Sequence, residues 1–133
     1  MTGITLSLAL QAAMLTSGAD GYADAYRATA SNGKPLVVLV GTDWCPGCRT
    51  MKQGVIPRLL GRGKMRNVNF AQVNSDDDWN LASQLLTGDT IPQLIVFTPT
   101  ENGWKRELAV GAKSDAEVEA MIDRAVEATK GAD

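Results

Sequence analysis

Five apolar residues in a row, at positions 36–40, constrain the fold of this chain more than any other feature of its sequence. Continuous apolarity, in place of an alternating pattern, is typical of a β-strand that is buried on both faces. Such a strand lies in a sheet that helices cover on each side, because each of its faces needs a hydrophobic partner. The run ends at Gly41, and both cysteines of the chain, Cys45 and Cys48, follow within seven residues. The sequence therefore predicts an α/β fold with a pair of thiols directly after a central strand.

The rest of the chain alternates between helical and strand patterns. In chain order we expect a helix from Tyr22, the strand at 36–40, and a helix from 46 to 60 that is interrupted at Pro57. A strand near 68–73, a short helix near 81–86, a strand at 94–97 and its hairpin partner at 104–110 follow. The last helix is opened by a capping box of Ser114 and Glu117. The acidic run at 76–78 suits the start of the short helix, and a cation site is the less favoured alternative. This order predicts an α/β sandwich with a mixed sheet and right-handed first crossovers.

Residues 1–19 form an apolar segment that precedes a single domain at 20–133. Positions 4–17 carry no charge, and the small residues that follow resemble the cleavage site of a secretory signal peptide. The same apolar spacing also fits a first structural element, so both interpretations stay open. The segment is too short to cross a bilayer comfortably, and we expect no stable membrane span in the mature domain.

The composition excludes several classes of function. The chain has 133 residues, two cysteines and no histidine. Without imidazole there is no Ser-His-Asp or Cys-His catalysis, and two cysteines cannot form a four-thiolate zinc site. The net charge of −2 gives no basic footprint for nucleic acid or anionic lipid. No glycine-rich phosphate loop is present either, and we expect no nucleotide, flavin, haem or other cofactor.

Cys45 and Cys48 flank a proline and a glycine at the start of a predicted helix. Residues three apart on a helix have Cβ atoms roughly 5–6 Å apart, and a disulfide needs about 3.5–4.5 Å. The pair can thus switch between dithiol and disulfide with little backbone movement. A structural disulfide is disfavoured because so short a loop gains little from closure. Two thiolates would hold a soft ion such as Cu(I), but the position after a strand favours a redox role.

The start of the helix also distinguishes the two thiols. Unpaired backbone N–H groups and the helix dipole stabilise a thiolate at Cys45, and the thiolate is the species that attacks disulfides. Cys48 lies one turn further in and is expected to be more shielded, which suits a resolving role. Pro46 is tolerated in the first turn because its missing N–H has no helical partner there. Gly47 is expected to leave room for a partner chain.

The residues around the thiols resemble the thioredoxin superfamily. The matching segments are Gly41-Thr42-Asp43-Trp44-Cys45-Pro46-Gly47-Cys48, Pro57 in the same helix, and Thr90-Ile91-Pro92 before a strand. The resemblance covers about residues 22–129 and implies the thioredoxin fold, a central mixed β-sheet flanked by helices on both faces. Lys34-Pro35 is similar to a feature of thioredoxin-like domains with a long first helix, many of which are exported. Export, to the periplasm or outside the cell, is therefore favoured over a cytoplasmic location.

The same resemblance implies a role for each residue of the site. Cys45 is the attacking thiolate and Cys48 the resolving thiol. Trp44 flanks the site, and Pro92, with a cis peptide bond after Ile91, faces the cysteines. The backbone of Ile91 is offered to an extended substrate strand. The implied substrate-binding residues are Trp44, Pro46, Gly47, Ile91 and Pro92.

Two positions depart from the pattern of thioredoxin itself. A buried aspartate on the central strand and a lysine on the next strand pair in that protein, and Leu39 and Gln72 stand at these positions here. Loss of both residues avoids a single buried charge without a partner. The departure leaves open which group accepts a proton from Cys48. Asp43 is the nearest carboxylate in sequence, and we expect it to tune the thiolate or to solvate its loop.

Residues and resemblance together predict a thiol–disulfide oxidoreductase that acts on protein disulfides. Its partners would be protein substrates with disulfides or thiols and an unidentified redox partner, and we expect a monomer. The dipeptide between the cysteines contains no histidine, which favours a reductant or isomerase because strongly oxidising relatives often carry one there. Two other functions stay open: a Cu(I)-binding module and a non-catalytic peptide-binding domain.

Overall fold

The computed structural model describes residues 19–130, which form one five-stranded sheet with helices on both faces. The strands are β1 (Ala19–Asp20), β2 (Leu36–Gly41), β3 (Asn69–Asn74), β4 (Gln93–Thr100) and β5 (Gly103–Val110). The helices are α2 (Tyr22–Asn32), α3 (Pro46–Thr50), α4 (Ile56–Gly61), α5 (Trp79–Leu85) and α6 (Asp115–Lys130), and the π-helical segment η1 (Met51–Val55) joins α3 to α4. The predicted signal-like segment at 1–19 lies outside the described residues, apart from Ala19 in β1.

The sheet is mixed, as predicted, and its order is β1-β3-β2-β4-β5. Strand β2 runs parallel to β3 and antiparallel to β4, so it has neighbours on both sides. Strands β4 and β5 form an antiparallel hairpin, and the short β1 pairs antiparallel with β3 at the opposite edge. The chain segment with the two cysteines lies in the helical crossover from β2 to β3, beyond the end of the central strand.

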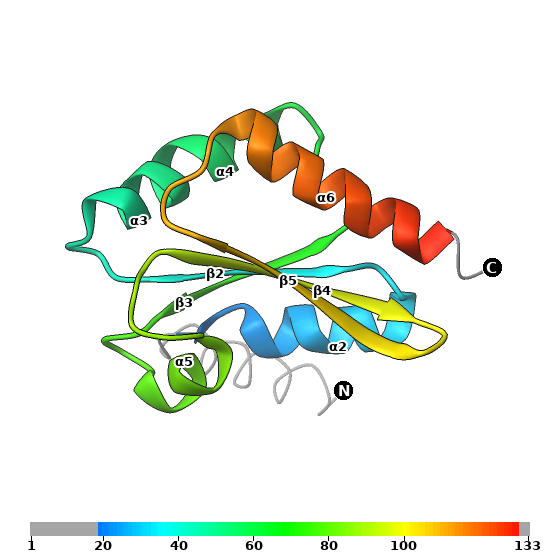
Figure 1. Ribbon diagram of the computed structural model, residues 1–133, viewed down its shortest axis with the longest axis horizontal. Helices are drawn as coiled ribbons and strands as arrows, with labels where there is room; N and C mark the ends of the chain where they lie inside the picture. Colours follow the sequence, from blue (N-terminus) through cyan, green and yellow to red (C-terminus); the bar gives the residue numbers. More distant parts are fainter. Residues whose placement is uncertain (1–18, 131–133) are drawn as a thin grey trace, which may run out of the picture.

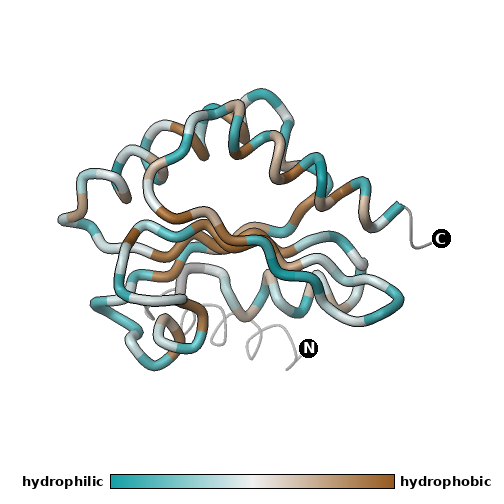
Figure 2. The backbone as a smooth tube through the Cα atoms, viewed as in Figure 1, coloured by the Kyte–Doolittle hydropathy of each residue, from teal (hydrophilic) through white to brown (hydrophobic). Residues whose placement is uncertain are grey.

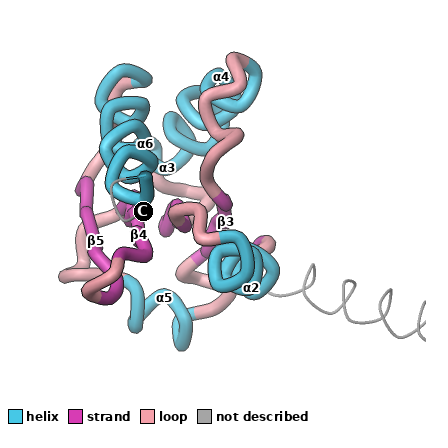
Figure 3. Tube along the Cα trace, turned by 90° about the vertical axis from the view of Figure 1, so that its right-hand side faces the viewer, coloured by secondary structure: helices cyan, strands magenta, loops and turns pink. Residues whose placement is uncertain are grey.

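Helices cover the two faces of the sheet in separate layers (Figures 1 and 3). Val37 and Leu39 pack into a cluster with η1, α4 and α6, whereas Val38 and Val40 pack into a second cluster with α2 and α5. Alternate residues of a strand point to opposite faces, so an unbroken apolar run serves two hydrophobic layers at once. The hydrophobic residues accordingly gather along the middle of the sheet (Figure 2). The predicted two-sided burial of this strand is confirmed.

The helix after the thiols is interrupted before Pro57, as expected, and the interruption is π-helical. Proline has no N–H, and its ring crowds the carbonyl four residues earlier, so a regular α-helical turn is unfavourable at this point. The N–H of Ile56 reaches back to the carbonyl of Met51, five residues earlier, which is the π-helical pairing. This turn keeps Met51, Val55 and Ile56 buried against the sheet.

Strand β4 is longer than the sequence predicts. Its residues were expected to turn at Pro99, but the strand continues to Thr100 and the hairpin turns at positions 101–102. Strand β2 pairs with β4 no further than Phe97, so Pro99 has a neighbouring strand on one side only, where its missing N–H is tolerated.

Within residues 19–130, no helix is long and apolar enough to cross a bilayer.

Candidate active site

The thiols lie at the junction between the central strand and the helix that follows it. Strand β2 ends at Gly41, and Cys45 caps the N-terminus of α3 in an extended conformation. The backbone N–H of Cys48 donates to Cys45 Sγ over 3.3 Å. This N–H is one of the groups that the first turn of a helix leaves without a backbone partner. The Cys45 sulfur therefore accepts a hydrogen bond of the kind that stabilises a thiolate.

Both cysteines are almost fully buried, with exposed fractions of 7% for Cys45 and 4% for Cys48. The expected difference in shielding is therefore small. Burial raises the pKa of Cys48 to about 11, the hydrogen bond with Cys45 adds to the rise, and a hydrogen bond from the Thr42 backbone opposes it. Cys48 consequently stays protonated at neutral pH, which suits a thiol that reacts second.

Gly41 is a site residue that sequence reasoning did not single out beyond its place at the end of the strand. A Cβ atom at this position would lie 2.5 Å from Cys48 Sγ and 3.0 Å from Cys48 Cβ. No side chain fits there without displacing the thiol. The glycine therefore lets Cys48 pack directly against the end of the central strand. A glycine at the end of a buried run, seven residues before the second cysteine, was the available signal.

The loop before β4 approaches the thiols from the other side. The peptide bond between Ile91 and Pro92 is cis, and Pro92 is buried. Cys45 Sγ lies 3.9 Å from the carbonyl oxygen of Ile91. A Cβ atom on Gly47 would lie 3.1 Å from Pro92 Cδ, so the small residue between the cysteines makes room for Pro92 within the chain. The sequence had suggested that this space serves a partner, whereas Pro92 already occupies the side that the added Cβ would enter.

Trp44 lies outside this packed cluster, with 65% of its surface exposed. Its indole N–H donates to a carboxylate oxygen of Asp76 over 2.8 Å, which links the loop before α3 to the loop after β3.

The side chain of Asp78 accepts the N–H of Leu81 and caps α5, as the acidic run predicts. Among residues 19–130, no three cysteine or carboxylate side chains come together as a metal site.

Gln93 was missed by sequence reasoning, although it holds the loop that carries Pro92. Its side chain is fully buried. Its amide nitrogen donates to the carbonyls of Thr87 (2.7 Å) and Thr90 (2.8 Å), and its amide oxygen accepts the N–H of Thr87 (3.0 Å). One side chain thus pairs with three backbone groups of a loop that has no regular secondary structure. The signal was a polar residue at the start of an otherwise apolar strand.

Leu39 and Gln72 face each other across β2 and β3, as their register requires. Both residues line a cavity that also contacts Cys48. Neither side chain titrates, so these two positions supply no proton acceptor to the cavity. The carboxylate that does line this cavity belongs to Asp43.

Comparisons with known proteins agree with this architecture. The solution structure of a thioredoxin from Thermus thermophilus has a TM-score of 0.64 and 20% identity, covering 77% of this chain and 82% of that one. Thioredoxin from Trichomonas vaginalis has a TM-score of 0.62 and 23% identity, with 79% and 90% covered. Thioredoxin from Fasciola hepatica has a TM-score of 0.56 and 22% identity, with 78% and 93% covered. These similarities show the thioredoxin fold.

A search of curated proteins finds no match for the chain. The family model described as Thioredoxin-like matches residues 17–99, which is more than half of the sequence and includes both cysteines and Pro92. This fold, with two neighbouring thiols, supports a role in thiol–disulfide redox chemistry in general. The chain therefore belongs to the thioredoxin-like family.

Proposed function

We propose that this protein is a thiol–disulfide oxidoreductase that exchanges a Cys45–Cys48 dithiol or disulfide with protein disulfides. The observation that carries the proposal is the hydrogen bond from the Cys48 backbone N–H to Cys45 Sγ at the helix start. It stabilises negative charge on one sulfur, while burial raises the pKa of the other. The pair thus offers one nucleophile and one protonated thiol within a single turn of helix.

The reaction proceeds through a mixed disulfide. The Cys45 thiolate attacks one sulfur of the substrate disulfide, and the other substrate sulfur leaves as a thiolate. Cys48 then loses its proton and attacks Cys45 Sγ, the bond between Cys45 and the substrate breaks, and the second substrate sulfur leaves. The substrate gains two electrons and two protons, and the enzyme keeps a Cys45–Cys48 disulfide. The reverse sequence would oxidise a substrate dithiol.

The substrate-binding surface that we propose surrounds the Cys45 sulfur. Trp44 and Pro46 are exposed on one side of it, and Ile91 is half-buried on the other. An extended substrate segment would pair with the Ile91 backbone as an added strand and contact the indole of Trp44. Gly47 and Pro92 complete this surface by packing against each other beneath the substrate.

The proposal also covers the direction of electron flow, the location of the protein and its oligomeric state. The dipeptide between the cysteines lacks the histidine that strongly oxidising relatives often carry, which favours a reductant or an isomerase. An unidentified redox partner would restore the dithiol. We also propose an exported monomer, on the basis of the apolar segment at 1–19 and the likeness of Lys34-Pro35 to exported relatives.

The test compares two single substitutions in an insulin-reduction assay with dithiothreitol. Cys45→Ser removes the nucleophile and is expected to abolish turnover. Cys48→Ser keeps the nucleophile but cannot resolve the mixed disulfide. When the reduced variant is freed of dithiothreitol and then mixed with insulin, it is expected to accumulate a covalent complex that survives on a non-reducing gel and separates on a reducing gel. Mass spectrometry of that complex should place the linkage at Cys45.

An exposed residue provides the matched control. Ser31→Ala lies on α2, on the opposite face of the sheet from the thiols, and is expected to turn over at the wild-type rate. Turnover by Cys45→Ser at the wild-type rate would contradict the mechanism. Retained binding of a protein partner by a variant that lacks both cysteines, without turnover in the wild type, would support a non-catalytic binding domain instead.

A further inference from the structure

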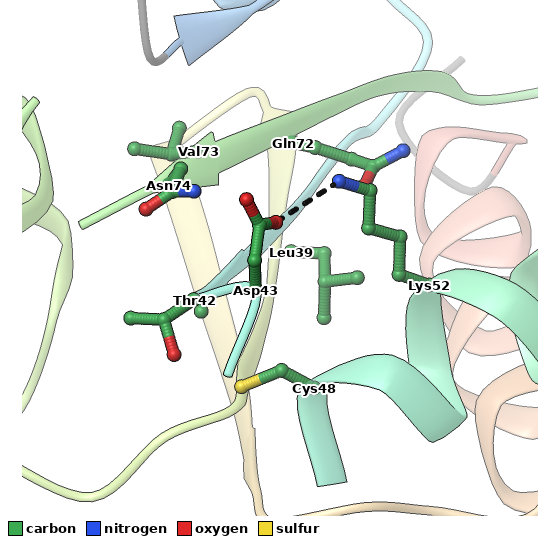
Figure 4. Close-up of a pocket in the computed structure, with 9 residues that line it drawn as sticks. Leu39, Thr42, Asp43, Cys48, Lys52, Gln72, Val73 and Asn74 are labelled. Atoms are coloured by element: carbon green, nitrogen blue, oxygen red, sulfur yellow. Dashed lines mark ion pairs between the residues drawn. The ribbon is translucent and has the colours of Figure 1, made fainter. Parts of the chain in front are cut away.

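A cavity of about 60 Å³ lies behind Cys48, between the ends of β2 and β3 and the helix that carries the thiols (Figure 4). A space of this size holds at least one water molecule if polar groups line it. Its polar and charged lining residues, besides Cys48, are Thr42, Asp43, Lys52, Gln72 and Asn74. The cavity therefore has the size and the polar lining to hold water between the resolving thiol and Asp43.

Two opposite charges stand at the mouth of this cavity. Lys52 Nζ lies 3.6 Å from a carboxylate oxygen of Asp43, and their side chains are 50% and 77% exposed (Figure 4). From β3, only the uncharged amides of Gln72 and Asn74 face this pair. The carboxylate of Asp76, in the loop after β3, accepts the indole N–H of Trp44. The guanidinium of Arg49 donates to the backbone carbonyl of Asp43 and not to the Asp43 carboxylate. That carboxylate is paired with Lys52.

The second chemical step requires a proton acceptor other than Cys45. In the mixed disulfide, Cys45 Sγ is bonded to the substrate and can no longer take a proton from Cys48. Cys48 is 4% exposed, and burial holds its thiol protonated at neutral pH. Leu39 and Gln72 have no group that titrates. Asp43 is the only carboxylate among the described residues that line the cavity.

We propose that Asp43 accepts the proton of Cys48 through water in this cavity and that Lys52 positions the Asp43 carboxylate. The proposal rests on the oxidoreductase function proposed above. The proton leaves Cys48 Sγ and passes through water to Asp43. The electron pair left on Cys48 Sγ forms the bond to Cys45 Sγ, and the bond between Cys45 and the substrate breaks. The substrate sulfur leaves with that electron pair and takes a proton from solvent, while Asp43 returns its proton to solvent at the mouth.

A stopped-flow reaction with one equivalent of dithiobis(nitrobenzoate) separates the two thiol steps. Attack by Cys45 releases the first coloured thiolate, and attack by Cys48 on the mixed disulfide releases the second. In Asp43→Asn we expect the first release at no less than the wild-type rate, because the loss of a negative charge does not disfavour the Cys45 thiolate. We expect the second release to slow by about 100-fold, the lower end of the usual range for general acid–base catalysis.

The pH profile of the second release distinguishes proton transfer from a structural effect. A carboxylate acceptor gives a rate that is independent of pH near neutrality, whereas in Asp43→Asn hydroxide must act, so the rate should rise about tenfold for each pH unit. Lys52→Met should slow the second release to a smaller degree, and Lys52→Arg should restore it. The matched controls are Asp77→Asn and Lys105→Gln, both exposed and outside the cavity, with both releases unchanged.

The two proposals fail in different ways. If the second release in Asp43→Asn keeps the rate and pH profile of Asp77→Asn, Asp43 is not the proton acceptor, and the oxidoreductase function is unaffected. If Lys52→Met matches wild type while Asp43→Asn is slow, the positioning role of Lys52 is refuted. If the wild-type dithiol releases no coloured thiolate at all, the oxidoreductase function fails, and this inference fails with it.

Discussion

Gly41 determines how closely the second thiol approaches the central strand. The position that a Cβ would occupy is already filled by Cys48 Sγ at 2.5 Å. The backbone of Gly41 belongs to the regular ladder of β2, where it pairs with Asn74 of β3. The requirement for glycine is therefore one of space at the thiol and not of backbone conformation.

Gly41→Ala is expected to lower the free energy of unfolding of the reduced protein by about 1–3 kcal/mol, because the added methyl group forces the Cys48 side chain to move. Urea unfolding monitored by circular dichroism measures the change. Gly61→Ala is the control, since no atom lies within 4 Å of a Cβ added there. Equal unfolding midpoints for the two variants would show that the end of β2 accommodates the added methyl group without loss of stability.

Single residues differ in how far the sequence reveals their roles. Cys45 at the helix start could be predicted, because its position depends on neighbours in the chain. The contacts of Trp44 with Asp76 and of Gly41 with Cys48 could not, because each depends on how two elements are brought together. The contact of Gly47 with Pro92 could not be predicted for the same reason, since Pro92 reaches it from a distant loop.

The segments around the site are held in place by side chains that form hydrogen bonds with backbone groups. The loop between α5 and β4 has no regular secondary structure, yet it must hold Pro92 against the thiols. Gln93 achieves this through its bonds to Thr87 and Thr90. Arg106 of the neighbouring strand β5 adds a bond to the hydroxyl of Thr87 over 2.9 Å.

Gln93→Leu preserves the size of the side chain but leaves one N–H and two carbonyl groups without partners. We expect the free energy of unfolding to fall by about 1–3 kcal/mol, since three hydrogen bonds of roughly 1 kcal/mol net each are lost. Denaturant titration measures the loss, and Gln53→Leu, at an exposed position of η1, is the control. A loss no larger than that of the control would mean that water replaces the amide.

Most elements could be predicted because their signals are local. The apolar run at 36–40 predicted a two-sided strand, and Ser114 does accept the N–H of Glu117 at the start of α6. Pro57 predicted an interruption but not its π-helical form, which depends on keeping both sides of the turn buried. The extension of β4 past Pro99 was missed because it depends on where the neighbouring strand β2 ends.

At the scale of the whole molecule, the stability of the dithiol form depends on the protonation of Cys48. Burial raises its pKa to about 11 in the folded protein, whereas a free thiol has a pKa of about 8.5. The folded state therefore favours the protonated thiol. The associated stability is fully present below about pH 8.5 and is lost as the pH rises from there toward 11.

Reduced wild-type protein is thus expected to lose stability on the order of 2 kcal/mol more than reduced Cys48→Ser between pH 8 and pH 11. Urea unfolding at a series of pH values in the presence of a non-thiol reductant measures the difference. Burial also raises the pKa of Tyr22, but this residue contributes equally to both proteins and cancels. Parallel stability curves would contradict the assignment of a buried, protonated thiol.

The placement of the tryptophans has an optical consequence. All three, Trp44, Trp79 and Trp104, are exposed on the folded protein. Their emission should already have the long wavelength of indole in water, so unfolding shifts the spectrum little. Trp44 stands next to Cys45, however, and a disulfide quenches a neighbouring indole. Tryptophan fluorescence should therefore report the redox state of this protein more faithfully than it reports folding.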